Sequence, residues 1–350
     1  MTTAEAQLLE DDPSDIPIYV AQDRYVNAYR ARRLYFEQEQ TPPAVFGVKD
    51  AIDIHCHANE GQQDPVAIAK LASSAGMKGI LFKTIVGAQR TDVVGPASLV
   101  REFEGPLEEW CNTEGVEPIK MWAGYATARG KKPPSAARTR VQLEDGVVSI
   151  WMPIATSVNS LHKVGMPIGS EDALEHTPPL PWDEAMRIGH YTLDEKGELK
   201  REIKEIFRLI ADFNVAVSFS HATHRELFAM ADIVRDLGIK KAYIDHPFSP
   251  FVNLTLEEMR QFTSEGIYLN FTFDEISPLL GVDPSLMCKT IQAVGTHHVT
   301  ISSDCGEPLF PNSVEGIRLL RGYMQAYGLT AEQIQEISVI NPEKIVGMRD

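Results

Sequence analysis

From residue 50 onward, short runs of apolar residues alternate with longer stretches in which apolar residues recur every three or four positions. Short apolar runs are typical of buried strands, and the longer period is that of a helix with one buried face. Their alternation predicts successive strand–helix units and therefore a parallel sheet. We place the strands at 51–55, 79–83, 119–125, 147–153, 215–221, 241–246, 266–272 and 298–304.

Between several of these strands the sequence predicts helices, at 64–76, 199–214, 224–238 and 255–266. Each helical segment ends at Gly or Asn, which often terminate a helix. Strands separated by helices favour an α/β fold, and their number favours a closed (β/α)8 TIM barrel over an open sheet. Such a barrel takes about 250 residues, so we assign residues 49–350 to one barrel domain.

Two segments do not follow this pattern. Residues 1–48 hold a charged, aromatic stretch that can form an amphipathic helix and then a Pro-Pro break, and we interpret them as an N-terminal helical extension. Residues 155–194, after the fourth strand, are rich in Gly, Pro, His and Trp. Long loops in compact domains are often functional, and the loops that follow barrel strands open onto the catalytic rim. We therefore predict that residues 155–194 form a lid over an active site.

The composition is that of an ordinary globular protein, with 43% hydrophobic and 23% charged residues. A net charge of -16 disfavours nucleic acid and anionic membrane surfaces as partners, so we expect a small-molecule substrate. The chain has no apolar run of about 18 residues and its acidic start lacks the basic region of a signal peptide, which predicts a cytoplasmic location. We also expect a homo-oligomer. The cysteines are widely spaced and are predicted to be reduced, with Cys56 and Cys305 as packing residues.

Residues of the types that bind metals stand at the ends of three predicted strands. His55 and His57 close the first strand, and because alternate strand residues face the same side, both imidazoles can converge on one ion. His221 ends the fifth strand and Asp304 ends the eighth. The carboxyl ends of barrel strands form the rim where active sites are built. We therefore predict that these four residues bind a divalent metal ion.

Other polar residues at the predicted rim are candidates for catalysis and substrate binding. His246 ends the sixth strand and is a candidate ligand of a second ion or a catalytic proton carrier. Regular alternation along this strand would turn its neighbour Asp245 outward. Lys83 closes the second strand, where it can bind a substrate carboxylate or, if carbamylated, bridge two metal ions. The further candidates for substrate contact are Tyr125, Asn159, His162, Trp182, Asn270 and Glu307.

This set of residues resembles the amidohydrolase superfamily, whose members carry a His-x-His pair on strand one, a His on strand five, often a His on strand six and an Asp on strand eight. The resemblance covers roughly residues 50–350, including a terminal NPEKIVGM that is similar to a common ending there. The segments GMKGILFKT, WMPIATSVNSLHK and IDHP look most like an uncharacterised amidohydrolase-like subgroup in which a Lys closes strand two. Many binuclear members have a carbamylated Lys on strand four, which this chain lacks. Either the site holds one ion, or Lys83 substitutes from strand two.

The resemblance implies a metal-dependent hydrolase with Zn²⁺, or alternatively Mn²⁺ or Fe²⁺, at one or two ions per chain. Asp304 would accept a proton from the attacking water and His246 would stabilise the oxyanion during hydrolysis of an amide, cyclic amide, lactone or related carbonyl. Two alternatives stay open. One is a metal-dependent decarboxylase or C–C hydrolase, in which Asp53 has the spacing of an additional ligand. The other is a non-catalytic metal-binding barrel.

Overall fold

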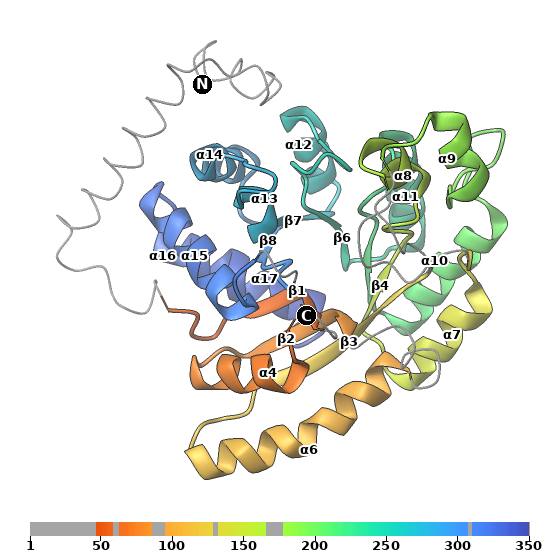
Figure 1. The fold of residues 1–350 in the computed structure, drawn as a ribbon. Helices are drawn as coiled ribbons and strands as arrows, with labels where there is room; N and C mark the ends of the chain where they lie inside the picture. The colour runs from red at the N-terminus through yellow and green to blue at the C-terminus, as the bar shows by residue number, and fades with distance from the viewer. Residues whose placement is uncertain are drawn as a thin grey trace.

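The computed structural model describes residues 47–58, 63–85, 95–128, 132–165, 178–306 and 310–349. Eight parallel strands are hydrogen-bonded in chain order and form a nearly closed barrel (Figure 1). The strands are β1 (Ile52–Ala58), β2 (Gly79–Ile85), β3 (Lys120–Ala126), β4 (Ser149–Trp151), β5 (Ala216–Ser218), β6 (Ala242–Asp245), β7 (Tyr268–Thr272) and β8 (Val299–Ser302). The predicted (β/α)8 barrel and all eight predicted strands are confirmed.

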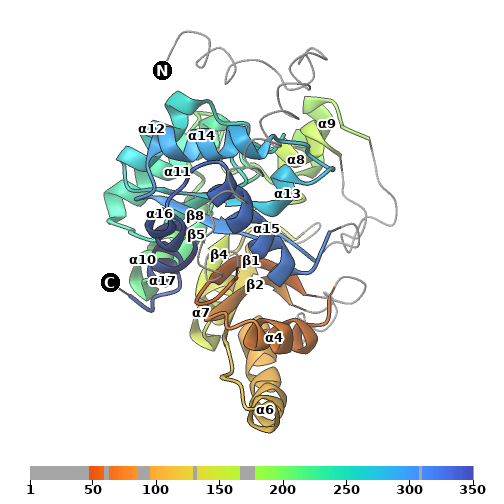
Figure 2. The same ribbon diagram turned by 90° about the vertical axis from the view of Figure 1, so that its left-hand side faces the viewer.

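Helices connect the strands, and most of them cover the outside of the barrel. They are α4 (Pro65–Ser74), α6 (Pro96–Glu114), α7 (Ala136–Asp145), α8 (Val158–Lys163), α9 (Trp182–Ile188), α10 (Arg201–Phe213), α11 (His224–Leu237), α12 (Leu256–Ser264), α13 (Phe273–Ile276), α14 (Pro284–Val294), α15 (Ser313–Ala326), α16 (Ala331–Gln335), the π-helix η2 (Glu336–Ile340) and α17 (Asn341–Ile345). The four helices predicted from the sequence correspond to α4, α10, α11 and α12. Neighbouring helices pack side by side, as α4 and α6 do in Figure 2. Within the described ranges, no helix has both the length and the apolar character needed to cross a membrane.

Two groups of buried apolar residues lie on opposite faces of the sheet. We call the first the inner cluster, because its members come from β1, β2, β4, β5, β6 and β7 and can only meet inside the barrel; they are Ile52, Ile54, Leu81, Trp151, Ala216, Tyr243, Tyr268, Ile345 and Val346. The outer cluster joins the strands to the helices and includes Ile80, Phe82 and Ile244. Ile345 and Val346 belong to the C-terminal segment, which therefore helps to fill the barrel. Alternation directs residues two positions after an inner residue to the interior as well.

The first strand is irregular in a way that matters for the histidines. Asp53 pairs with Ile80, but the next pairing is Cys56 with Phe82, so the register slips between them. Without this slip, alternation after Ile54 would turn His55 outward. An extra residue in one strand re-aims the side chains that follow it. Ile54 and His55 can therefore both lie on the inner side.

The barrel closes where β1 meets the segment after β8. The Asp304 backbone N–H donates to the His55 carbonyl at 2.8 Å, and the His57 N–H donates to the Cys305 carbonyl at 2.9 Å. Gly306 approaches so closely that an added Cβ would lie 2.3 Å from the His57 carbonyl oxygen. Closure itself thus brings Asp304, near the end of the chain, next to the His-x-His segment.

The segments predicted to extend the barrel are described only in part. Residues 1–46 lie outside the described residues, so the N-terminal extension stays a prediction. Residues 155–194 contain two helices, α8 and α9, while 166–177 lie outside the described residues. The Ser157 hydroxyl donates to the His221 carbonyl at 2.8 Å, so this insertion packs on the carboxyl end of β5, the predicted side.

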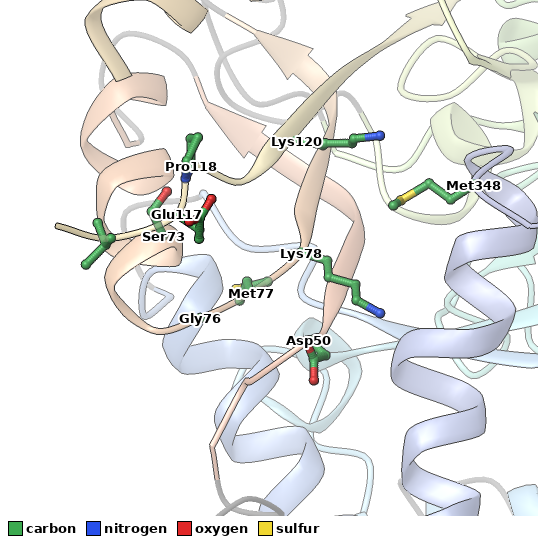
Figure 3. Close-up of a pocket in the computed structure, with 10 residues that line it drawn as sticks. Asp50, Ser73, Gly76, Met77, Lys78, Glu117, Pro118, Lys120 and Met348 are labelled. Atoms are coloured by element: carbon green, nitrogen blue, oxygen red, sulfur yellow. The ribbon is translucent and has the colours of Figure 1, made fainter. Parts of the chain in front are cut away.

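A cavity of about 550 Å³ lies at the opposite end of the barrel (Figure 3). Its lining includes Asp50, Lys78 and Lys120. Asp50 comes before β1, Lys78 comes directly before β2, and Lys120 is the first residue of β3. Lys78 is paired with Glu343 at 2.7 Å. Residues at the amino ends of barrel strands contribute mainly to stability, so we do not associate this cavity with the candidate site.

Gly124 on β3 is predicted to be essential for packing, because an added Cβ would lie 2.1 Å from the Trp151 ring. Overpacking a core costs about 1–3 kcal/mol. Gly124→Ala should therefore lower the melting temperature by several degrees in a thermal unfolding measurement. Gly105→Ala on α6 is the control, since nothing lies within 4 Å of its added Cβ. Equal melting temperatures for both variants would contradict the packing argument.

Candidate metal centre

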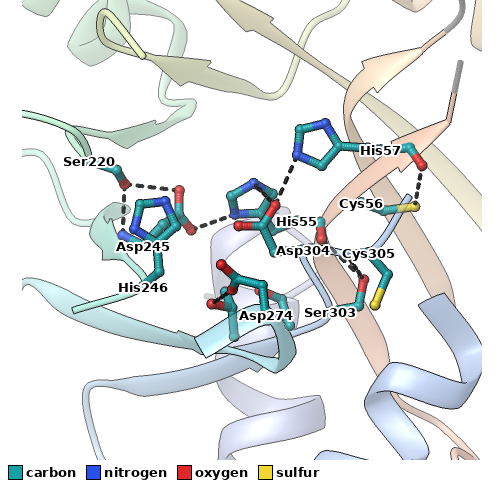
Figure 4. A network of polar contacts seen from close by, with 12 residues as sticks. His55, Cys56, His57, Ser220, Asp245, His246, Asp274, Ser303, Asp304 and Cys305 are labelled. Atoms are coloured by element: carbon teal, nitrogen blue, oxygen red, sulfur yellow. Dashed lines mark hydrogen bonds and ion pairs between the residues drawn. The ribbon is translucent and has the colours of Figure 1, made fainter. Parts of the chain in front are cut away.

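Three of the four predicted metal ligands converge at the carboxyl end of the barrel. The Nε2 atoms of His55 and His57 each lie 2.9 Å from Oδ1 of Asp304, as Figure 4 shows. The potential ligand atoms of these three residues lie within 4.8 Å of one another. The structure thus brings residues from strand one and strand eight to one point, and their role as metal ligands stays a prediction.

His221 and His246 form a second pair beside this group. Their ring centroids are 4.9 Å apart, and the His246 ring lies 6.1 Å from that of His55. His221 is not one of the three residues whose ligand atoms already converge. Its role as a metal ligand stays a prediction, as does the catalytic role of His246.

A hydroxyl group fixes one ring nitrogen of each of these two histidines. Ser160 Oγ lies 2.8 Å from Nδ1 of His221, and Ser249 Oγ lies 2.9 Å from Nδ1 of His246. The Nε2 atom of each ring is therefore the one available for an ion or a substrate. Ser160 belongs to α8, so the insertion after β4 helps to orient a predicted ligand.

His221, His246 and Asp304 share an unusual backbone conformation. Their φ angles are 61°, 40° and 49°, in the left-handed region that residues other than glycine rarely adopt. His246 follows β6 directly, whereas His221 and Asp304 come shortly after the ends of β5 and β8. Such conformations concentrate at functional sites, where the surrounding structure holds them. Here they turn the chain at the strand ends.

Asp245 was predicted to face outward, and this was wrong. It is fully buried, two residues after Tyr243 of the inner cluster, and alternation therefore places it inside the barrel. The left-handed turn at His246 is what brings that residue to the site as well, so the two neighbours do not point in opposite directions.

The Asp245 carboxylate is the centre of a buried hydrogen-bond network. It accepts hydrogen bonds from Trp151 Nε1 at 2.8 Å, Ser218 Oγ at 2.7 Å, Ser220 Oγ at 3.1 Å and Asn270 Nδ2 at 2.6 Å. Its Oδ1 also lies 3.1 Å from Nδ1 of His55. Carboxylates beside ligand histidines orient the ring and set its tautomer, and Asp245 is placed to do this for His55.

Burial and charge give the site residues contrasting protonation. Burial lowers the pKa of His57 and of His221, and lowers the pKa of His246 to about 4. Burial alone would also lower the pKa of His55, but Asp245 and Asp304 on either side raise it to about 9. Although burial opposes ionisation, the positive charge of His55 holds the pKa of Asp304 well below its usual range. At neutral pH the metal-free site thus holds neutral imidazoles at His57, His221 and His246, a protonated His55 and an anionic Asp304.

These residues fit a divalent metal ion. Both ring nitrogens of His55 are buried beside carboxylates, but neither contact has the alignment of a good hydrogen bond, and such groups gain from a better partner. In a tetrahedral zinc site with bonds of about 2.1 Å, neighbouring ligand atoms lie roughly 3.4 Å apart, close to the spacing between the histidine nitrogens and Asp304. Imidazole and carboxylate are suitable ligands for Zn²⁺ and similar ions.

Lys83, predicted to face the centre, is only 5% exposed and comes from β2. Asn270 is buried in the network around Asp245, where its Nδ2 also donates to Ser302 Oγ at 2.6 Å. Tyr125 packs against the outer cluster, away from the interior. A role of these three residues in substrate binding stays a prediction.

The remaining candidates belong to the insertion or lie beyond the described residues. Asn159 Nδ2 donates to the carbonyls of Ala222 and Phe251. His162 Nδ1 lies 2.9 Å from the Leu180 carbonyl, and the ring meets the Trp182 ring edge-on at 5.4 Å. Trp182 is 41% exposed. Glu307 lies outside the described residues.

Sequence reasoning missed Asp274, which follows β7 in α13. Figure 4 places its carboxyl group beside Asp304 and His55. Burial and the neighbouring charge of Asp304 raise its pKa to about 8, so it is largely protonated at neutral pH. The acidic pair Asp274 and Glu275 directly after a strand was the available sequence signal.

Comparison with solved structures places the fold in a defined class. An amidohydrolase from Pseudomonas aeruginosa superposes with a TM-score of 0.56 at 12% identity, covering 88% of this chain and 98% of its own. The probable dipeptidase PvdM from Pseudomonas aeruginosa gives a TM-score of 0.52 at 13% identity, covering 87% and 96%. A 5-methylcytosine deaminase from Klebsiella pneumoniae gives 0.52 at 11% identity, covering 86% and 76%. The chain thus shares a TIM-barrel fold with these proteins.

Within this class, a family model matches residues 50–270, more than half of the chain. The protein belongs to that family, which is described as a family of unknown function (DUF6282). A comparison with curated proteins finds no match.

Replacing Asp245 with Asn should weaken metal binding about 10- to 100-fold, the usual effect of removing a carboxylate partner of a ligand histidine. The variant keeps the shape of the side chain but removes the charge beside His55. Competition with a chelator measures the affinity. Ser220→Ala is the control, because it removes one donor to the same carboxylate and leaves its charge in place. Wild-type affinity in Asp245→Asn would rule out the orienting role.

Proposed function

We propose that the protein is a metal-dependent hydrolase that uses one divalent ion, most favourably Zn²⁺, to cleave an amide, cyclic amide, lactone or related carbonyl compound. The observation that carries the proposal is the convergence of His55, His57 and Asp304 at the carboxyl rim of an amidohydrolase-type barrel. His221 is the fourth proposed ligand. The similar structures of an amidohydrolase, a dipeptidase and a deaminase agree with hydrolytic chemistry in this fold.

A divalent ion bound there would supply an activated water at neutral pH and would polarise the carbonyl group. Asp304, held as an anion, accepts the proton of the attacking water and passes it to the leaving group. If Ser249 donates to Nδ1 of His246, the Nε2–H of this neutral ring donates to the developing oxyanion. If Nδ1 of His221 donates to Ser160, the Nε2 lone pair of this ring would be the one left to hold the ion.

A single ion is favoured by the side chain that β4 presents. Trp151 points into the barrel, where its ring lies 5.9 Å from that of His55 and its N–H is bonded to Asp245. The indole offers no metal ligand, so β4 supplies none to bridge a second ion.

The decarboxylase alternative draws no support from Asp53. Its carboxylate accepts from the Ser303 N–H at 3.0 Å, from Ser303 Oγ at 2.5 Å and from the His55 N–H at 3.1 Å. These contacts bind β1 to the segment after β8, which is the role of a packing residue. The small-molecule substrate, the cytoplasmic location, the homo-oligomeric state and the lid over the site stay predictions from the sequence.

We expect His55→Ala and Asp304→Ala to fold but to bind little metal. Their rates of hydrolysis on a panel of amides and lactones should fall at least about 100-fold, which is the lower end of the effect expected when a catalytic proton acceptor is lost. Metal analysis and initial rates on the purified variants measure both. His224→Ala serves as control, since this residue is 43% exposed and paired with Glu258. Normal metal content and turnover in both site variants would refute the proposed function.

Metal affinity should rise with pH. His55, with a pKa of about 9 in the metal-free protein, must lose its proton before Nε2 can bind an ion. Below pH 9 the apparent dissociation constant should therefore fall about tenfold per pH unit, and above pH 9 it should level off. Titration with chelator-buffered Zn²⁺, corrected for protonation of the chelator, measures this. A flat profile between pH 7 and 9 would contradict the assignment.

A further inference from the structure

Lys83 is a buried cation that no described residue pairs with. Its side chain is 5% exposed, and lysine is almost never so buried unless it is paired. In the described part of the chain, the ammonium group makes no hydrogen bond and has no carboxylate within ion-pair distance. A charge buried without a partner is unfavourable, which points to a partner that the described residues do not supply.

The strand directs this charge to the candidate metal centre. Leu81, two residues earlier, belongs to the inner cluster. Phe82 is in register with Cys56 and Thr84 with His57, so the pairing slips at Lys83, which lies beside the His-x-His segment. The positive charge of Lys83 contributes to the low pKa of Asp304 and to that of Asp245, which places it within electrostatic reach of both carboxylates.

The nearby carboxylates are occupied by other groups. Asp245 is bonded to four side-chain donors and paired with His55. Asp304 lies against His55 and His57 and is a proposed metal ligand. Among the described residues, neither carboxylate is thus free to pair with Lys83, which favours a group of the substrate as its partner.

We propose that Lys83 binds a carboxylate group of the substrate, so that the enzyme acts on small amides, cyclic amides or lactones that are themselves carboxylic acids. This inference rests on the proposed hydrolase function. A lysine ammonium binds such an anion as a compact point charge, and the charge-assisted bond fixes the substrate relative to the metal site. Lys83 is thus a determinant of substrate specificity.

The same surroundings disfavour the carbamylated form of Lys83. Carbamylation would turn a cationic group into an anionic one near the carboxylates of Asp245 and Asp304, which is electrostatically unfavourable. A carbamate would also be expected to bridge two ions, and β4 presents Trp151 in place of a further ligand.

Paired hydroxamates test the proposal without knowledge of the natural substrate. The hydroxamate end binds zinc, and a tail of one to three methylenes ends in either a carboxylate or the matching carboxamide. We expect the Zn²⁺-loaded protein to bind the carboxylate about tenfold more tightly than the carboxamide for at least one tail length, as measured by titration calorimetry. In Lys83→Met the two should bind within about twofold of each other, and Lys83→Arg should restore part of the preference.

Lys78→Met is the matched control, since Lys78 is paired with Glu343 at the opposite end of the barrel and its loss should leave the preference intact. Equal binding of both probes by the wild type at every tail length, or a preference that survives in Lys83→Met, would overturn the proposal. So would a carbamate signal in ¹³C NMR with labelled bicarbonate together with two zinc ions per chain. Failure of every hydroxamate to bind would instead refute the metal site of the proposed function.

Discussion

The buried carboxylate of Asp245 is the constraint around which the catalytic end of the barrel is arranged. An ionised carboxylate inside a protein costs several kcal/mol unless hydrogen bonds and opposite charge compensate. The donors come from Trp151 on β4, Ser218 on β5 with Ser220 just after it, and Asn270 on β7, while His55 on β1 supplies the charge. One side chain on β6 therefore ties together four other strands, at the level directly beneath the proposed metal ligands.

This network explains why His55 can serve as a ligand. A buried imidazole is normally driven to its neutral form with either nitrogen protonated. Asp245 fixes the proton on Nδ1, and barrel closure places Asp304 opposite Nε2. The metal-free centre then holds a proton where a divalent ion would bind, so ion and proton compete for one position. To bring its carboxylate to this position, Asp304 adopts a left-handed backbone conformation, which is unfavourable for a residue other than glycine.

Much of this could be predicted from the sequence, because strands leave a visible pattern. Apolar runs located all eight strands, and a polar residue after such a run identified His55, His57 and Asp304 as residues of one rim. The direction of a side chain at a strand end is different, since it depends on local dihedral angles. Asp245 was assigned outward because His246 was assumed to continue a regular strand, whereas its φ of 40° breaks the alternation.

Asp274 shows a second limit of sequence reasoning. Its approach to the centre depends on the short helix α13 directly after β7, an element too brief to leave a periodic pattern. Asn270 illustrates the converse case. It was assigned to the rim as a substrate ligand, yet it lies in the middle of β7 and its amide is bonded to Asp245 and Ser302 inside the barrel. Residue type and strand position predict membership of the rim, but hydrogen-bond partners decide whether a side chain faces the substrate or supports its neighbours.

The absence of a β4 ligand is built into the packing of the barrel. Trp151 stands where a β4 ligand would be, and its ring fits there only because Gly124 on β3 has no side chain. The indole N–H is also one of the donors to the Asp245 carboxylate. Exchanging Trp151 for a lysine would leave a void beside Gly124 and remove a bond from the carboxylate that orients His55. The number of metal ligands is therefore coupled to the same network that positions them. Lys83 on β2 then lies beside one proposed ion rather than bridging two, which agrees with the acidic substrate that we propose as its partner.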